Sequence, residues 1–127
     1  MMSKQDLIQL NRPAPQVEEL DGWKVVRELI PGRYFSAASD LDFEYIPNKT
    51  QHRPPRYIGG PLAVFAEKAF AEAFIRGTMN RVIFPCKYVR SKDRHLWICS
   101  DDGEDYVALK DELPEGTDFA DEITILA

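Results

Sequence analysis

The stretch LAVFAEKAFAEAFIRGTMNRVIF, Leu62 to Phe84, predicts a strand, a helix and a second strand in succession. LAVF is a short apolar run, which favours a fully buried strand. Apolar residues then recur at intervals of three and four, the spacing of an amphipathic helix over about residues 66–76 with Gly77 as its C-terminal cap. VIF begins the next strand, so the stretch predicts a compact βαβ-like unit. The apolar stripe of the helix comprises Ala66, Ala69, Phe70, Ala73 and Phe74.

Further strands are predicted before this unit. Residues 23–30, WKVVRELI, mix apolar and charged side chains with β-branched valines, which is typical of a strand with two distinct faces. Pro31-Gly32 favours a turn, and YFSAAS and FEYI predict two short strands after it. The first three strands are therefore expected to form an antiparallel meander.

The C-terminal part also predicts strands. RVIFPCKYV is one, although Pro85 requires a sheet edge or a bulge. HLWIC and YVALK flank SDDGED, where Asp102-Gly103 favours a hairpin, and ITIL predicts a final strand. We therefore expect a single α+β domain over residues 22–127, a mainly antiparallel sheet with one principal helix. Residues 1–21, whose helical potential is broken by two prolines, are expected to form an N-terminal arm or cap.

Length and composition limit the class of protein. A chain of 127 residues with 44% hydrophobic content fits one domain with one core. No apolar run approaches the roughly 20 residues that span a bilayer, and the N-terminus lacks a signal-peptide layout, so a soluble intracellular protein with no membrane partner is expected. Cys86 and Cys99 are too few for a disulfide framework and lack the paired spacing of a zinc site, which favours free thiols in a reducing compartment.

Charge is strongly segregated along the chain. Residues 1–46 carry a net charge of −3, residues 47–100 carry +7, and residues 101–127 carry −9. A basic middle and an acidic end either pack against each other or form two oppositely charged faces. We expect the first arrangement.

The loop 47–61, PNKTQHRPPRYIGGP, is the best candidate ligand surface. Its four prolines and two glycines predict no regular element, and loops of this length are often functional. Arginine forks, an aromatic ring and backbone N–H groups beside glycine together predict a cradle for an anion or nucleotide. The alternative is that the loop is a long crossover. The residues of the cradle are His52, Arg53, Arg56, Tyr57, Gly59 and Gly60.

Several chemistries are disfavoured by the motifs. The spacing of His52 and His95 predicts no metal site. Cys86 and Cys99 alternate with apolar residues, which favours inert buried thiols over a Cys-His nucleophile. Walker, Rossmann and serine-elbow motifs are absent. We therefore predict no cofactor, no metal and no catalytic residue.

Nucleic acid is a disfavoured partner. The basic middle is interspersed with Tyr57, Tyr88 and Trp97, but the overall pI of about 5.0 and the acidic end oppose phosphate binding. The basic residues are Lys49, Arg53, Arg56, Arg76, Arg81, Lys87, Arg90, Lys92 and Arg94.

The acidic segment 101–122 has alternatives of its own. Its spacing does not fit a calcium loop, which favours a solvated hairpin tip. Mimicry of nucleic-acid phosphate is a further alternative. If the partner is a protein, the docking residues are expected to be Asp101, Asp102, Glu104 and Asp105.

The succession KVVR, RYIGGPLAVF, an A..F helix and VIFPCKYVRS over about residues 23–98 resembles a set of small uncharacterised proteins of bacteria, archaea and phages. That resemblance carries no catalytic residues, and the acidic end lies outside it. It implies an accessory role, such as antagonism of host defence, in the cytoplasm, which is the host cytoplasm if a phage encodes the protein.

A fainter resemblance is to ADP-ribosyltransferase-like domains, in which an arginine, a serine and a glutamate grip a dinucleotide. It places Arg27 and Ser36 in the first two roles. The glutamate has no counterpart in the pattern, because Glu67 and Glu72 lie on the predicted helix, and the chain is short for that fold.

These observations favour a non-catalytic binding protein over an enzyme. The expected ligand is a nucleotide-like anion or a protein, bound by the loop 49–60 together with Arg27 and neighbouring aromatic residues. The alternatives are a dinucleotide-acting enzyme and a nucleic-acid binder or mimic. An enzyme requires a carboxylate or a histidine within hydrogen-bond reach of Arg27 or Ser36. Homodimerisation through a sheet edge is also compatible with the sequence.

Overall fold

The computed structural model describes residues 18–37, 43–53, 61–93, 95–99 and 105–127. Within these ranges the fold is mostly antiparallel β with one short helix, which confirms the predicted α+β class. The elements follow in the order β1 (Glu19–Ile30), β2 (Arg33–Ser36), β3 (Glu44–Tyr45), β4 (Gln51–His52), β5 (Leu62–Phe65), α2 (Lys68–Ile75), β6 (Arg81–Arg90), β7 (His95–Cys99), β8 (Asp105–Leu109), a 3-10 turn (Lys110–Glu112) and β9 (Thr117–Ile125).

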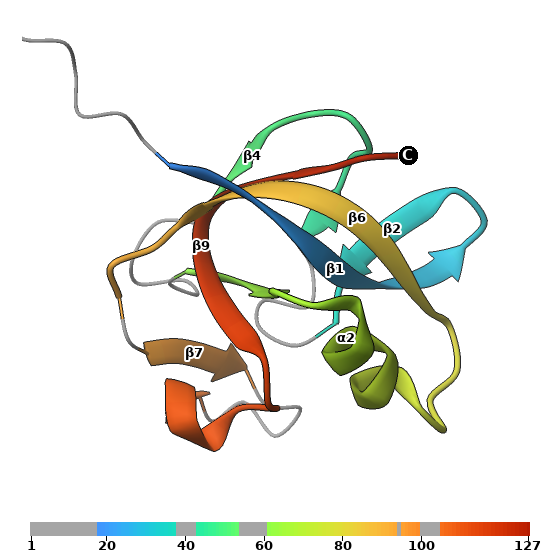
Figure 1. Cartoon of the computed structure of the whole chain (residues 1–127). Coiled ribbons are helices and arrows are strands. Elements are labelled where there is room, and N and C mark those ends of the chain that lie inside the picture. Colours follow the sequence, from blue (N-terminus) through green and yellow to red (C-terminus); the bar gives the residue numbers. More distant parts are fainter. Residues whose placement is uncertain (1–17, 38–42, 54–60, 94, 100–104) are drawn as a thin grey trace, which may run out of the picture.

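Four strands close into a small barrel, in which β1 and β6 cross the upper half of the view and β9 descends beside them (Figure 1). β1 pairs with β6, β6 with β9, and β9 with β5. β5 returns to β1 where Trp23 lies opposite Phe65. All four pairings are antiparallel. β2 and β3 extend the sheet from β1, and β4 extends it from β9.

Most of the predicted strands are confirmed. β1, β2 and β3 pair in sequence order as the expected meander. β7 and β8 form the expected hairpin, and its turn at Asp102-Gly103 lies outside the described residues. The strand predicted from ITIL is longer than expected, because β9 already begins at Thr117.

The loop 47–61 requires a correction. Gln51 and His52 form the short strand β4 on the edge of β9, and the Arg53 N–H donates to the Asp121 carbonyl at 2.8 Å. No local pattern predicts this strand, because its two residues pair with Ile123 and Glu122, about seventy positions further along the chain. Residues 54–60 lie outside the described residues.

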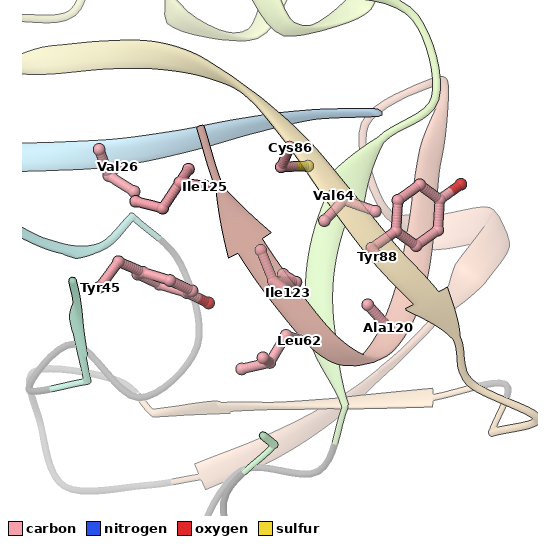
Figure 2. Packing of buried hydrophobic residues seen from close by; sticks show 9 residues of the cluster. All are labelled: Val26, Tyr45, Leu62, Val64, Cys86, Tyr88, Ala120, Ile123 and Ile125. Carbon is pink, nitrogen blue, oxygen red and sulfur yellow. The ribbon is translucent and has the colours of Figure 1, made fainter. Parts of the chain in front are cut away.

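The barrel interior is filled by aliphatic, aromatic and sulfur-containing side chains from five strands (Figure 2). The interior needs glycine at position 22, because a Cβ there would lie 2.7 Å from the Tyr88 ring. A side chain at position 22 would therefore force the Tyr88 ring or the backbone beside it to shift. The nine buried residues of the interior are Val26, Tyr45, Leu62, Val64, Cys86, Tyr88, Ala120, Ile123 and Ile125.

α2 covers the outer face of β1, where a second cluster packs around Val25, Phe65 and Ala71. The predicted helix is confirmed with a different buried face. Ala71 is fully buried and Phe70, Phe74 and Ile75 are half-buried, whereas Ala66, Ala69 and Ala73 of the predicted stripe are exposed. The rotation follows from the two phenylalanines and Ile75, which bury more apolar area than alanines can.

The end of α2 follows its sequence signal. Arg76 leaves the helical region with φ −58° and ψ 124°, and Gly77 follows with φ +80°. The Thr78 N–H donates to the Ile75 carbonyl at 2.9 Å. These angles define a type II turn, which requires positive φ at its third residue and so explains the glycine. Within the described part of the chain, no helix is long and apolar enough to cross a membrane.

Pro85 lies in β6 without a bulge on the β1 side, where it faces Trp23. Its carbonyl accepts from the Leu126 N–H at 2.9 Å, on the side of β9. The missing N–H of the proline points to that same side, just beyond the last residue of β9. Pro85 therefore lies at the end of the β6–β9 ladder in a strand that pairs on both sides, and neither a sheet edge nor a bulge is needed there. β5 and β6 run in the same direction on either side of β1, which confirms the βαβ-like unit.

Candidate functional site

Two arginines face each other across the β1–β6 ladder at the end of the barrel. Arg27 of β1 lies directly opposite Arg81 of β6. At the next position of this ladder, the Glu28 N–H donates a hydrogen bond of 2.9 Å to the Asn80 carbonyl. Hydrogen-bonded and non-hydrogen-bonded pairs alternate along an antiparallel ladder, so Arg27 and Arg81 form a non-hydrogen-bonded pair, in which side chains lie closer together. Like charges placed opposite each other are destabilising.

The electrostatics of Arg81 reflect this placement. Burial lowers the pKa of the Arg81 guanidinium, and the neighbouring charge of Arg27 lowers that pKa further. Arg81 donates through Nη1 to the Met79 carbonyl at 3.3 Å. Because an arginine side chain keeps its charge at every physiological pH, the two cations remain side by side.

Ser36 joins this end of the barrel from β2. The Nε of Arg27 donates to the Ser36 carbonyl at 2.7 Å, and Ser36 is buried. The structure thus brings together the two residues that the ADP-ribosyltransferase resemblance pairs. The contact runs through the main-chain oxygen of Ser36.

Exposed large aliphatic residues follow Arg27 in β1 and precede Arg81 in the chain. Leu29 and Ile30 at the end of β1 are 54% and 52% exposed, and Met79 before β6 is 81% exposed. Leu29 lies at the point where the β1–β2 register shifts between Glu28 and Ile30. Such bulges redirect side chains and are common beside functional sites. We call Arg27, Leu29, Ile30, Met79 and Arg81 the arginine–aliphatic patch.

The sequence did not single out this patch. Leu29, Ile30 and Met79 read as ordinary members of a strand and a loop. Arg81 was predicted as one of many residues of the basic middle. To bring these residues together, one would need to know the register between β1 and β6, which pairs residues more than fifty positions apart.

Arg53, by contrast, is held by carboxylates. Its Nη1 lies 2.5 Å from Asp93 Oδ2 and 3.0 Å from Asp121 Oδ1, with the Ser91 hydroxyl at 3.3 Å. Its side chain is 22% exposed. Burial alone lowers the pKa of Arg53, but the hydrogen bonds that Arg53 donates to Asp93 and Asp121 outweigh burial and raise the pKa. An anionic ligand at Arg53 would have to displace two carboxylates, so Asp93 and Asp121 compete with a ligand at this part of the predicted cradle.

Other cations of the basic middle also meet acids of β9. His52 Nδ1 lies 3.0 Å from Glu122, and Arg90 Nε lies 2.9 Å from Asp118. Asp118 is buried and also accepts from the Tyr88 hydroxyl at 2.8 Å. The expectation that the basic middle and the acidic end pack against each other is therefore confirmed for these residues.

The carboxylate of Asp118 depends on these contacts. Burial by itself raises its pKa, but the hydrogen bonds from Tyr88 and Arg90 outweigh burial, and the pKa of Asp118 is lowered. For Tyr88, burial and the hydrogen bond to Asp118 raise the pKa to about 12. Tyr88 is therefore protonated at neutral pH and donates its hydroxyl hydrogen to Asp118.

Lys24 is a buried charge that the sequence reading missed. Its Nζ donates to the Ala63 carbonyl at 2.6 Å and lies 5.0 Å from the centre of the Tyr45 ring. Burial lowers its pKa to about 8. Because side chains alternate along a strand, Lys24 lies on the same face of β1 as the buried Val26, and this spacing could have predicted its burial. Burial raises the pKa of Cys86 to about 12, so this thiol stays protonated, in line with the expected inert cysteine.

Several predicted residues lie outside the described part of the chain. Asp105 is described only by its backbone, in β8. Among the residues that the structure describes, no three His, Cys, Asp or Glu side chains gather to hold a metal ion. The residues outside the described ranges are Arg56, Tyr57, Gly59, Gly60, Asp101, Asp102 and Glu104.

Comparison with known proteins adds no assignment. The sequence matches no protein-family model, no curated protein and no solved structure. The functional argument rests on the geometry above.

Proposed function

We propose that this protein is a non-catalytic binding protein that recognises an anionic group at the pair Arg27–Arg81. The observation that supports the proposal is the placement of two arginines directly opposite each other in the β1–β6 ladder. Such a pair costs free energy in the unliganded protein. An anion placed between the two guanidinium groups would offset that cost and accept charge-assisted hydrogen bonds.

The two arginine sites of the chain differ in what they offer a ligand. At Arg53 two carboxylates already neutralise the guanidinium. At Arg27 and Arg81 the nearest charged neighbour across the ladder has the same sign. An external anion at the second site can accept hydrogen bonds from two guanidinium groups at once. The predicted cradle of the loop 49–60 remains a prediction, because most of its residues lie outside the described ranges.

Thermal unfolding with a panel of anions tests this proposal. Purified protein is unfolded alone and with inorganic pyrophosphate and with mono-, di- and cyclic nucleotides. A ligand at a hundred times its dissociation constant stabilises the folded state by about 2.7 kcal/mol. We expect at least one anion to raise the Tm of the native protein and not that of Arg81→Gln. Lys92→Gln, which removes an exposed cation at the other end of β6, is the matched control and should keep the shift.

The outcome that contradicts the proposal is equally specific. A shift that survives Arg81→Gln and Arg27→Gln but disappears in Arg53→Gln would place the anion at the loop. The absence of a shift with every anion would remove the basis for a small anionic ligand.

The contact between Arg27 and Ser36 favours one alternative, an enzyme acting on a dinucleotide. This alternative predicts that the protein, incubated with a dinucleotide, releases cleavage products that chromatography separates, and that Arg27→Gln stops the release. Stoichiometric binding with no product would favour the binding protein.

A further inference from the structure

We propose that two copies of this protein associate by pairing the first part of β6, residues 81–84, edge to edge and antiparallel. We call this segment the open edge of β6. The inference does not rest on the proposed anion site. It is carried by a stretch of backbone that has a strand on one side only, and by the side chains that decide which strand fits the other side.

The open edge begins where the ladder between β6 and β9 ends. β6 pairs with β1 from Arg81 to Val89, but its pairing with β9 starts only at Cys86. The last bond on that side runs from the Leu126 N–H to the Pro85 carbonyl at 2.9 Å. Among the residues that the structure describes, no strand pairs with residues 81–84 on the side away from β1.

The backbone of the open edge directs hydrogen-bonding groups outward at two positions. The bond from the Glu28 N–H to the Asn80 carbonyl shows that even-numbered residues of this segment face β1, since the groups alternate along a strand. The N–H and C=O of Arg81 and Ile83 therefore face away from β1, as the Pro85 carbonyl does. Within the described ranges these four groups make no backbone hydrogen bond. Unpaired groups in a row are a template for another strand.

The side chains suit a second copy in one register. When the two-fold axis passes through Val82, Arg81 of each copy lies opposite Ile83 of the other, and four backbone hydrogen bonds form. No like charges are then opposed. An axis through Arg81 would oppose two arginines, which is destabilising. An axis through Ile83 would require a donor at Pro85, which has no N–H and whose carbonyl is already bonded to Leu126.

This register also extends an apolar row of the sheet. Val82 lies opposite Val26 in the β1–β6 ladder, and Val82 of one copy would lie opposite Val82 of the other. Val26 is fully buried, whereas Val82 is half-buried against the barrel interior. Apolar β-branched pairs across strands stabilise a sheet, so the pairing completes the burial of Val82. Any extended segment could use the backbone groups, but these side-chain matches favour a second copy.

The ends of the open edge limit the pairing to a short segment. Asn80 has a positive φ of 60°, which ends the strand before Arg81, and Leu126 lies beside Pro85 at the other end. Met79 is 81% exposed and Leu126 is 38% exposed. Antiparallel pairing brings the start of one segment to the end of the other, so Met79 of one copy would approach Leu126 of the other. Strands this short bury less area than a standard interface, so we expect a weak, concentration-dependent dimer.

Disulfide cross-linking tests the register. Val82→Cys is placed in a Cys99→Ser background, so that the buried Cys86 is the only other thiol. Residues that form a non-hydrogen-bonded pair have Cβ atoms close to the spacing of a disulfide. Mild oxidation should therefore convert most of this variant to a covalent dimer. Val89→Cys in the same background replaces a half-buried valine that pairs with both β1 and β9; it is the matched control and should stay monomeric.

Sedimentation velocity over a range of concentrations measures the association itself. Ile83→Pro removes an N–H that the pairing needs and that the β1 ladder does not use. Ile83→Ala loses the same apolar packing but keeps the N–H, so it is the matched control. We expect Ile83→Pro to raise the dissociation constant of the dimer about tenfold relative to Ile83→Ala, because two hydrogen bonds across the interface are lost. Circular dichroism checks that both variants fold; if Ile83→Pro does not, the cross-linking of Val82→Cys decides.

Three results would overturn the inference. A native protein that stays monomeric at its highest soluble concentration would leave the open edge to a different partner. A dimer that Ile83→Pro and Ile83→Ala affect equally would have its interface elsewhere. Equal cross-linking of Val82→Cys and Val89→Cys would reflect random collision. None of these experiments contains an anion, so each of these results leaves the proposed anion site standing.

Discussion

The barrel carries its cations in two different ways. Along β9, Arg53, Arg90 and His52 each meet a carboxylate of the acidic end. At the end of β1 and β6, Arg27 meets Arg81. The first arrangement connects distant segments and stabilises the fold, whereas in the second two like charges lie opposite each other in the ladder, which costs stability. The number of arginines in a segment therefore says little about ligand binding, which depends on the charges that each side chain faces.

The largest expected effect tests the stabilising arrangement. Arg53→Met should lower the free energy of unfolding by about 3 kcal/mol, because it leaves Asp93 and Asp121 close together and removes their shared cation. Urea unfolding at pH 7 measures this loss. Arg76→Met, which removes an exposed arginine, is the control and should change the free energy by less than about 0.5 kcal/mol. Equal effects of the two variants would show that the Arg53 contacts contribute nothing.

Asp118 gives a second test on the β9 side. Asp118→Asn should cost about 2 kcal/mol at pH 7, because the hydrogen bonds from Tyr88 and Arg90 lose their anionic acceptor. The pKa of Asp118 is lowered in the folded state, so its contribution is present above its ordinary pKa and is lost as the pH falls through the folded value. Urea unfolding below pH 4 should therefore show a smaller difference between the variant and the native protein. A difference that stays constant with pH would contradict this.

Lys24 differs from both arrangements, since its charge is buried beside a carbonyl and a ring. Burial lowers the pKa of Lys24 from its ordinary 10.5 to about 8 in the folded protein, so between pH 8 and 9 the folded protein loses a proton that the unfolded chain keeps. The free energy of unfolding should therefore rise by about 1 kcal/mol over that unit. Above pH 9 the free energy of unfolding should fall again, because the raised pKa of Cys86 keeps its thiol protonated in the folded state while the unfolded chain loses that proton.

Urea unfolding at pH 7.5, 8 and 9 measures this rise. Lys24→Met should show no rise, because the titrating amine is gone. A native protein whose stability is flat or falls between pH 8 and 9 would mean that Lys24 is not desolvated as described.

The smallest expected effect concerns the arginine pair. Arg81→Gln should leave the free energy of unfolding unchanged or raise it by about 0.5 kcal/mol, because it relieves repulsion with Arg27. The same variant should lose anion binding. A loss of more than about 1 kcal/mol in urea unfolding would show that Arg81 stabilises the fold, and the contrast with Arg53 would disappear.

Local features of the fold could be predicted from the sequence. The apolar run of β5, the spacing within α2 and the positive φ at Gly77 each depend on neighbours in the chain, so the pattern carries them. The closure of the barrel depends on β5 meeting both β1 and β9. Pairings at such separation leave no local signal, which is why β4 on the edge of β9 was missed as well.

The contacts of the candidate site also differ in how far the sequence predicts them. Arg27 and Ser36 are nine positions apart, and their contact follows from the β1–β2 hairpin that the sequence predicts. The opposition of Arg27 and Arg81 follows from the register of β1 and β6, which a single sequence does not contain. The same holds for Arg53, because its partners Asp93 and Asp121 are 40 and 68 positions away.

The central claim is that an external anion binds where cation faces cation. Two-dimensional NMR of the arginine Nε–Hε groups, recorded during a titration with inorganic pyrophosphate, tests it most directly. We expect the resonances of Arg27 and Arg81 to move in a saturable way while those of Arg53 and Arg90 stay in place. Saturable movement at Arg53 with Arg27 and Arg81 unchanged, or no saturable movement at any of the four, would contradict the claim.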